Sequence, residues 1–126
     1  MNVLLDTHIL LWWLADDRAL PDVARTVIAD PATTVVVSAA TVWEIAIKKA
    51  AGRLDAPDNL MPTLDDNDFD TLPMTASHAL DAGRLPLHHA DPFDRMLIAQ
   101  AAAEDLTLVT ADRRFDHYDV PVLPLG

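Results

Sequence analysis

Four carboxylates stand out in this sequence because each lies beside a strongly apolar segment. Asp6 ends the run VLLD, and Asp112 ends the run LVTAD. Glu44 lies within TVWEIAIKK, and Asp94 lies within DPFDRMLIA. A buried charge is costly unless a partner or a bound ion neutralises it. Asp6 is therefore expected either at the end of an element, where water reaches it, or in a site.

Brought together, these acids have the chemistry of a site for divalent cations. Several carboxylates in one place repel one another strongly unless cations lie among them. The chain has no cysteine, and hard oxygen ligands suit Mg²⁺ or Mn²⁺, which also take phosphate oxygens as ligands. A metal held in this way can activate water and stabilise a leaving oxygen. The chemistry implied is metal-assisted hydrolysis of a phosphodiester.

Simpler interpretations are available for two of the acids. Glu44 and Lys48 are four residues apart, which is the spacing of a surface ion pair on a helix, worth about 0.2–0.5 kcal/mol. Asp91 and Asp94 are three residues apart, as are an N-cap and a first-turn acid, which the helix dipole favours. Spacing alone leaves these interpretations open beside the metal-binding one.

The apolar pattern predicts the elements that must position the acids. Strands are expected at 3–5, 33–37 and 106–109, with possible strands at 69–73 and 120–123. Helices are expected at 8–15 with Thr7 as its cap, and at 21–30, 39–51, 75–83 and 91–105, with one short helix within 53–68. The segments 86–90 and 110–118 are expected to be loops.

Short apolar strands that alternate with helices predict an α/β fold with a central, mainly parallel sheet covered on both faces. In such sheets, ligands bind beyond the carboxyl ends of the strands. Asp6 and Asp112 both follow strands, so we expect them to converge on one crevice. Residues 1–126 are expected to form a single domain, because no repeat or long linker divides them.

The overall charge narrows the possible partners. A net charge of −11 argues against a broad basic face for duplex nucleic acid, which binds by neutralising many phosphates. It does not exclude an enzyme that acts on nucleic acid, because a bound metal reverses the sign of the local charge.

The apolar run 9–15 is far shorter than the roughly 20 residues that span a bilayer, and the start has no basic leader. We expect a cytoplasmic protein without a membrane partner.

Four segments in order, VLLDTHILLWWL, SAATVWEIAIKKAAGRL, LPLHHADPFDRMLIAQA and LVTADRRFDHY, resemble a PIN-domain ribonuclease of the VapC toxin type. The resemblance spans nearly the whole chain, and only residues 55–71 are uninformative. It implies a PIN-like α/β/α sandwich, a single PIN domain over 1–126, and an acidic metal-binding pocket. It also implies RNA, often tRNA or rRNA, as the substrate, a homodimer, and a cognate antitoxin with a segment that enters the pocket.

The family's acids map onto Asp6, Glu44, Asp94 and Asp112, the four acids reached from the sequence pattern. We expect Asp6, Asp94 and Asp112 to hold Mg²⁺ or Mn²⁺, directly or through water, and Glu44 to position or activate the attacking water. Outer-shell roles are expected for Asp91, Thr110 and Asp116. Contacts to RNA phosphates or unpaired bases are expected from His88, His89, Arg95, Arg113 and Arg114, unless these residues are simply a solvated set of loop charges.

A different class of protein competes with the enzyme. A non-catalytic, dimeric nucleic-acid-binding or regulatory module could also carry an acidic pocket, although the complete set of four acids favours catalysis. A phosphorylatable receiver domain needs an aspartate after a central strand and a lysine near the end of a late strand. Here VVVS ends in Ser38, and the only lysines are Lys48 and Lys49 in the middle of the chain.

Overall fold

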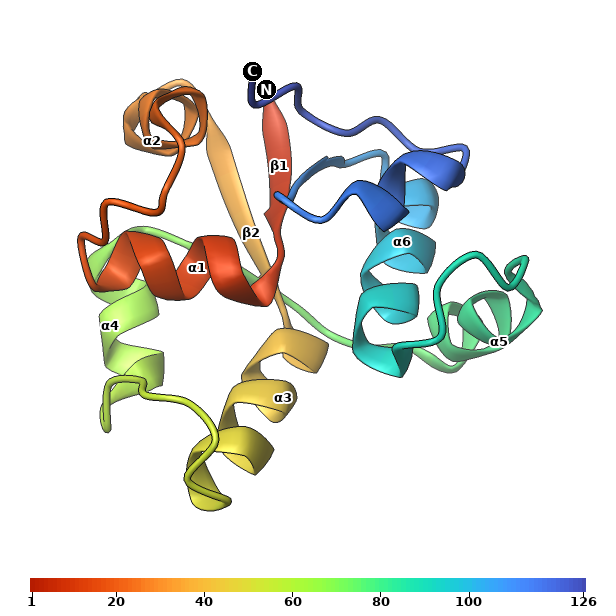
Figure 1. Ribbon diagram of the computed structural model, residues 1–126, viewed down its shortest axis with the longest axis horizontal. Coiled ribbons are helices and arrows are strands. Elements are labelled where there is room, and N and C mark those ends of the chain that lie inside the picture. The colour runs from red at the N-terminus through yellow and green to blue at the C-terminus, as the bar shows by residue number, and fades with distance from the viewer.

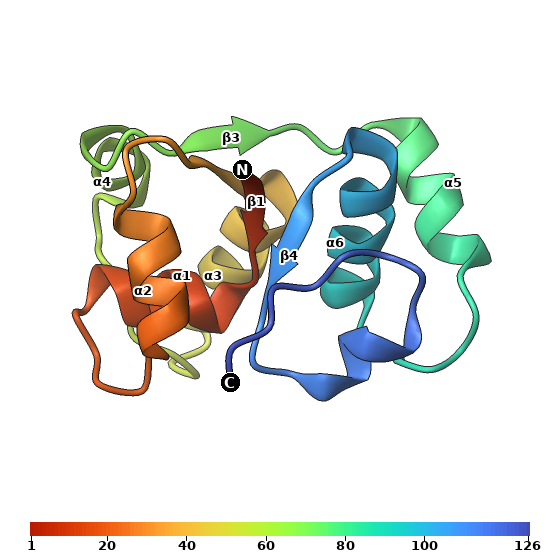
Figure 2. The ribbon, with the colours of Figure 1, turned by 90° about the horizontal axis from the view of Figure 1, so that it is seen from above.

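The computed structural model describes residues 1–126 and places a four-stranded sheet between two groups of helices (Figures 1 and 2). The strands are β1 (Asn2–Leu5), β2 (Thr34–Ser38), β3 (Asp70–Leu72) and β4 (Thr107–Val109), in the order β3-β2-β1-β4. The helices are α1 (Thr7–Leu14), α2 (Asp22–Ala29), α3 (Ala39–Ala50), α4 (Leu60–Asp66), α5 (Ala76–Arg84), α6 (Pro92–Glu104) and the 3₁₀ helix η1 (Arg113–His117). All three strand pairs are parallel, which confirms the α/β class.

Both faces of the sheet are apolar. Successive residues of a strand point to opposite faces, so an unbroken apolar run places apolar side chains on both. Val3 and Leu5 belong to a core cluster with residues of α1, α2, α3 and α4. Leu4 lies between them in sequence but belongs to a second cluster, formed with α6 and η1. Figure 2 shows α1, α2 and α4 on one side of the sheet and α5 and α6 on the other. The predicted α/β/α arrangement is therefore confirmed.

The register of the central strands fixes which residues meet at the carboxyl edge of the sheet. Leu5 of β1 is level with Val109 of β4. The chain continues the pairing for one more residue, since the N–H of Asp6 donates to the carbonyl of Val109 at 3.1 Å. Asp6 and the residues that follow β4 consequently lie at the same edge. The helix α3 begins at this edge too, directly after β2, and contacts α1 and α6.

Side-chain caps start four of the α-helices, α1, α3, α5 and α6, and the cap of α1 differs from the prediction. Asp6, and not Thr7, caps α1 by accepting the backbone N–H of Ile9 at 2.9 Å. Thr7 is the first helical residue, and its hydroxyl is engaged elsewhere. Ser38 caps α3 and Asp91 caps α6, each by accepting a backbone N–H from the first turn. The prediction of Thr7 as the cap was wrong.

Two expected elements near the C-terminus also differ. Within the loop expected at 110–118, Arg113–His117 form η1, because the Asp112 carboxylate accepts the N–H of Arg114 and starts the turn. The strand expected at 120–123 is reduced to a single bridge between Leu108 and Val122. Proline has no N–H to donate, and Pro121 and Pro124 flank this bridge.

The other predicted elements agree with the structure to within one residue at each end, and the short helix expected within 53–68 is α4. No helix has both the length and the apolar character needed to cross a membrane.

Candidate active site

The acids singled out from the sequence gather at the carboxyl edge of the sheet, near the starts of helices. Asp6 caps α1, Asp112 caps η1, and Asp94 lies in the first turn of α6. Glu44 comes from the second turn of α3. The N-terminus of a helix carries a partial positive charge that stabilises a nearby carboxylate. The fold therefore brings acids from four separate segments together and partly offsets their charge.

Asp6 is linked to Asp112 through one threonine. The Asp6 carboxylate is buried, and its Oδ2 accepts a hydrogen bond from the hydroxyl of Thr110. The same hydroxyl oxygen accepts the backbone N–H of Asp112 at 3.0 Å. Burial raises the pKa of Asp6, and the hydrogen bonds from Thr110 and from the Ile9 amide act in the opposite direction. Thr110 thus holds the ends of β1 and β4 together at the site.

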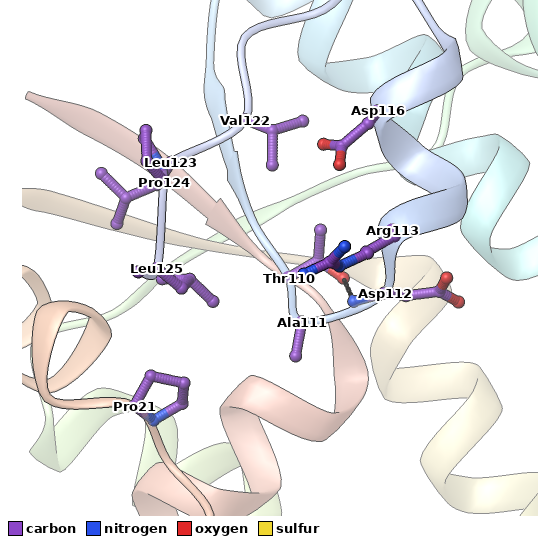
Figure 3. Close-up of a pocket in the computed structure, with 11 residues that line it drawn as sticks. Pro21, Thr110, Ala111, Asp112, Arg113, Asp116, Val122, Leu123, Pro124 and Leu125 are labelled. Carbon is purple, nitrogen blue, oxygen red and sulfur yellow. Dashed lines mark hydrogen bonds between the residues drawn. The ribbon is translucent and has the colours of Figure 1, made fainter.

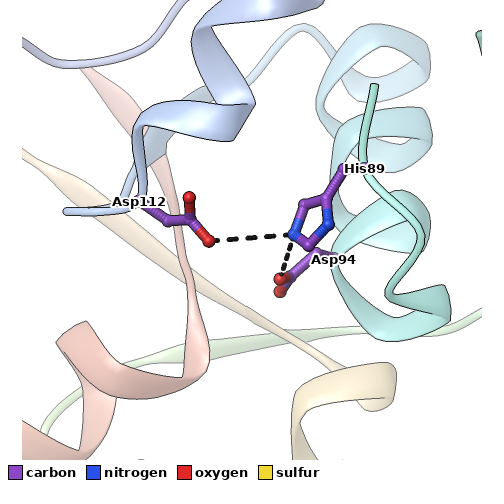
Figure 4. Close-up of side chains that lie close together, drawn as sticks. All are labelled: His89, Asp94 and Asp112. Carbon is purple, nitrogen blue, oxygen red and sulfur yellow. Dashed lines mark hydrogen bonds and ion pairs between the residues drawn. The ribbon is translucent and has the colours of Figure 1, made fainter. Parts of the chain in front are cut away.

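Asp94 and Asp112 approach one another across an imidazole (Figure 4). Nε2 of His89 lies 2.7 Å from Oδ2 of Asp94 and 3.8 Å from Oδ2 of Asp112. Burial, together with the negative charge of Asp91, raises the pKa of Asp94 to about 6, while the hydrogen bond from His89 lowers it. A cation bound at this position would stabilise the ionised form of Asp94.

Asp112 has a further partner on the outside of the site. The guanidinium of Arg114 contacts both of its oxygens, with Nη2 at 2.7 Å from Oδ2 and Nε at 3.1 Å from Oδ1. These hydrogen bonds lower the pKa of Asp112, so its carboxylate is ionised at neutral pH. Arg114 itself is exposed. The pair can therefore exchange with an incoming phosphate or cation without unfolding any buried structure.

Glu44 combines features of both interpretations of its sequence. It does pair with Lys48, with Nζ at 2.5 Å from Oε2. The carboxylate of the pair is not on the surface, however, because the Glu44 side chain is only 7% exposed. Its other oxygen accepts the hydroxyl of Thr7, the residue next to Asp6. Glu44 is thereby connected to the end of β1 through a single side chain.

The donor set fits a divalent metal ion. Donor atoms of His89, Asp94 and Asp112 lie within 4.8 Å of one another. Asp6 adjoins this group, because the Thr110 hydroxyl that donates to the Asp6 carboxylate also accepts the backbone N–H of Asp112. Carboxylate oxygens that repel one another at close range are the ligands that Mg²⁺ and Mn²⁺ prefer.

The sequence interpretation assigned His89 to RNA, whereas the structure places it among the acids. Its side chain is 1% exposed and is therefore not available to a large ligand. A local signal for this contact existed: side chains in a helix tilt toward its N-terminus. Asp94 in the first turn of α6 therefore points back toward the residues that precede the helix, and His89 is one of them.

Arg95 also differs from its expected role in RNA binding. It is buried, and its two terminal nitrogens donate to four backbone carbonyls at the end of α5 and in the loop that follows. These are the carbonyls of Ala82 (2.9 Å), Leu85 (2.9 Å), Pro86 (3.0 Å) and His89 (3.2 Å). Arg95 therefore holds the α5–α6 loop, and we leave it out of the substrate contacts.

The remaining predicted residues lie around the acids. His88 is exposed, with its ring 5.3 Å from that of Tyr118. Arg113 and Asp116 line a cavity of about 580 Å³ between η1 and the C-terminal residues (Figure 3). Thr110 and Asp112 lie at the border of the same cavity. Asp91 caps α6 by accepting the N–H of Asp94 at 3.0 Å.

The chain is similar to known proteins in both its sequence and its fold. A model of the PIN domain matches residues 3–121. Over 123 residues the chain is 31% identical to Ribonuclease VapC22 of Mycobacterium tuberculosis, with 95% of this chain and 94% of that protein covered.

Solved structures of two complexes share the fold. One is a toxin–antitoxin complex from Klebsiella pneumoniae, with a TM-score of 0.70 and 17% identity. The other is VapBC2 from Rickettsia felis bound to a DNA fragment from its promoter, with a TM-score of 0.69 and 18% identity. In both cases 98% of this chain and 98% of the compared chain are covered. From its sequence match and its architecture, the chain belongs to the PIN-domain family, among the relatives of VapC type.

Proposed function

We propose that this protein is a metal-dependent endoribonuclease and the toxin of a toxin–antitoxin pair. The observation that carries the proposal is the convergence of Asp6, Asp94 and Asp112 from three segments onto one edge of the sheet. The identity to a protein named Ribonuclease VapC22 supports the reaction class. The structures of VapBC2 and of a toxin–antitoxin complex support the choice of partner.

Asp6, Asp94 and Asp112 would hold Mg²⁺ or Mn²⁺, with Thr110 and Asp91 in outer positions that fix the carboxylates. When bound, the ion would activate water and stabilise the leaving oxygen of a phosphodiester. Glu44 lies beside this group and would position the attacking water or accept its proton. Asp116 is a more distant outer-shell candidate, because it lines the same cavity as Asp112.

The substrate is proposed to be RNA, with tRNA or rRNA as the first candidates. The exposed cations beside the acids are Arg113 and Arg114, and His88 adds an exposed ring. With a net charge of −11, the protein would bind RNA locally through these side chains and the metal, and not through a broad basic face. Such a small contact area suits an unpaired loop, whose bases are free to stack.

Two protein partners complete the proposal, for a toxin that acts in the cytoplasm. A cognate antitoxin would inhibit the enzyme by placing a segment in the acidic pocket. A second copy of the chain would form a homodimer, and α3 offers an apolar strip for it. Trp43 and Ile47, one helical turn apart, are 55% and 44% exposed. Large apolar side chains exposed side by side are typical of interfaces.

The test compares cleavage of a mixed tRNA and rRNA pool by the native protein and by Asp94→Asn, each with Mg²⁺, Mn²⁺ or EDTA. Asn has the shape of Asp and can still accept the hydrogen bond from His89. Asp65→Asn, at an exposed position of α4, is the matched control. We expect discrete cuts that need metal, persist in Asp65→Asn and vanish in Asp94→Asn. Equal cleavage by all three proteins, or none by folded native protein free of antitoxin, would favour a non-catalytic binding module.

A further inference from the structure

His89 is held in place through both its backbone and its ring. Its backbone N–H donates to the hydroxyl of Tyr118 at 2.9 Å, and its carbonyl accepts from Arg95 at 3.2 Å. Its ring packs against Phe115, with the ring centres 5.8 Å apart and the planes at 72°. The backbone groups and the ring of this residue therefore all have partners.

The α5–α6 loop that carries His89 is fixed by the same two side chains. The hydroxyl of Tyr118 donates to the carbonyl of Pro86 at 2.7 Å, and Arg95 donates to the same carbonyl at 3.0 Å. Arg95 comes from α6, whereas Tyr118 follows η1. The loop is therefore held between the two elements that supply Asp94 and Asp112. This arrangement gives the imidazole a defined position relative to both acids.

The two ring nitrogens of His89 face different partners. Nδ1 accepts the backbone N–H of Asp91 at 3.4 Å, which favours the tautomer without a proton on Nδ1. In the neutral ring the proton is then on Nε2, which lies 2.7 Å from Oδ2 of Asp94 and donates to it. A metal bound at Nε2 would require the proton on Nδ1, where it would face the N–H of Asp91 donor to donor. The geometry disfavours His89 as a metal ligand, although its nitrogen lies close to the two acids.

We propose that His89 is a positioning residue, which fixes the Asp94 carboxylate through the Nε2–H bond and leaves the other oxygen of Asp94 to the cation. This inference rests on the proposed metal centre and adds that its protein ligands are oxygens only. Ligating groups are commonly oriented by such outer contacts. Oxygen donors favour Mg²⁺ and Mn²⁺ over softer ions, so a site whose protein ligands are oxygens only is suited to hard cations.

Binding of Mn²⁺ without RNA, followed by electron paramagnetic resonance, tests the role in four proteins. These are the native protein, His88→Gln as the matched control at the exposed neighbour, His89→Gln and His89→Leu. The glutamine amide can still donate to Asp94, but leucine cannot. We expect His89→Leu to bind Mn²⁺ about 10- to 100-fold more weakly, and His89→Gln and His88→Gln to stay within a few-fold of the native protein.

Three results would overturn the inference in different ways. An equal loss in His89→Gln and His89→Leu would make the imidazole a ligand. Native affinity in His89→Leu would overturn the positioning role alone and leave the metal centre intact. A native protein that binds no Mn²⁺ would overturn the proposed metal centre and this inference together. Thermal unfolding of each protein without metal shows that the variants are folded.

The tautomer can be read in the native protein, so the inference does not depend on a variant's folding. Nitrogen-15 NMR of histidine-labelled protein distinguishes a ring protonated at Nε2 from one protonated at Nδ1, and His89→Gln identifies the signal. We expect the Nε2–H form before and after addition of Mg²⁺. A proton on Nδ1, or loss of the Nε2 proton when Mg²⁺ is added, would contradict a donor role for His89.

Discussion

Asp6 and Thr110, which are 104 residues apart in the sequence, are joined by a buried hydrogen bond between carboxylate and hydroxyl. The contact follows from the parallel pairing of β1 with β4, because both residues directly follow the paired strands. The hydroxyl oxygen of Thr110 also accepts a hydrogen bond from the backbone N–H of Asp112. One side chain therefore sets the distance between two of the proposed metal ligands.

Replacing Thr110 by valine, which has nearly the same shape, removes this link. The buried Oδ2 of Asp6 and the N–H of Asp112 would lose their partner. We expect the free energy of unfolding to fall by about 1–3 kcal/mol, together with a weaker affinity for Mn²⁺. Urea denaturation measures the first and metal titration the second. Thr107→Val, in the strand β4 that Thr110 follows, is the control, and equal losses in the two variants would show that the hydroxyl of Thr110 has no special part.

Asp94→Asn should stabilise the metal-free protein at neutral pH. The pKa of Asp94 is raised from 3.8 to about 6, so the folded protein binds this proton more tightly than the unfolded chain does. The stability that protonation adds is complete below about pH 4 and is lost as the pH rises through about 6. One pKa unit corresponds to roughly 1.4 kcal/mol, and partial exposure reduces the effect. We expect Asp94→Asn to be about 1–2 kcal/mol more stable at pH 7.5.

The difference between these two proteins should shrink as the pH is lowered from 7.5 to 4, because native Asp94 then becomes neutral like asparagine. Urea unfolding at several pH values, in EDTA, follows this trend. A constant difference across the range would mean that the ionisation of Asp94 is not the source of the effect.

Metal binding should have the opposite dependence on pH. A cation needs the ionised carboxylate of Asp94, so the affinity for Mn²⁺ is expected to fall as the pH drops below about 6. At saturating Mn²⁺ the pH at which Asp94 is half ionised should be lower, because the bound cation competes with the proton for the carboxylate. Calorimetric titrations between pH 5 and pH 8 would measure both effects. An affinity that stays constant down to pH 5 would remove Asp94 from the ligands.

Glu44→Gln separates the chemical step from metal binding. Glutamine can still accept the hydroxyl of Thr7 but cannot take a proton from water. We expect the rate of RNA cleavage to fall by about 10²- to 10⁴-fold, with Mn²⁺ affinity close to that of the native protein. Single-turnover cleavage and metal titration give the two numbers. A parallel loss of both would instead make Glu44 a metal ligand.

The position of the acids could be predicted from the sequence because it depends on local rules. Strand ends in a parallel sheet share one edge, so VLLD and LVTAD place Asp6 and Asp112 together without any knowledge of long-range contacts. Asp91 and Asp94 follow from the rules for helix starts. The parallel sheet follows in the same way, from strands that alternate with helices.

The choice between two possible caps could not be predicted locally. Asp6 and Thr7 are both good N-cap residues, and the sequence around them does not separate the two. In the structure the hydroxyl of Thr7 donates to Glu44, 37 residues away. This hydroxyl is therefore engaged outside the cap, and Asp6 caps the helix. The contact of His89 with Asp94 had a local signal, whereas the hydrogen bond between His89 and Tyr118 joins residues 29 positions apart.

Arg95 also shows what the local sequence does not reveal. A basic residue beside the acids predicted a contact with RNA, but in the structure its hydrogen bonds go to the backbone at the end of α5 and in the α5–α6 loop. Four backbone carbonyls accept hydrogen bonds from its guanidinium. Lysine at this position keeps the charge but has three donors on a single nitrogen and no planar fork, so it cannot reach all four. Buried acceptors without partners cost about 1–3 kcal/mol each.

Arg95→Lys should therefore lower the free energy of unfolding by about 2–3 kcal/mol and leave the KM for RNA near the native value at temperatures where the protein stays folded. Arg113→Lys, at an exposed position in η1, is the matched control and should leave stability unchanged. Urea denaturation and cleavage kinetics measure the two properties. If Arg95→Lys were as stable as the native protein and raised KM, the guanidinium would belong to the RNA contacts after all.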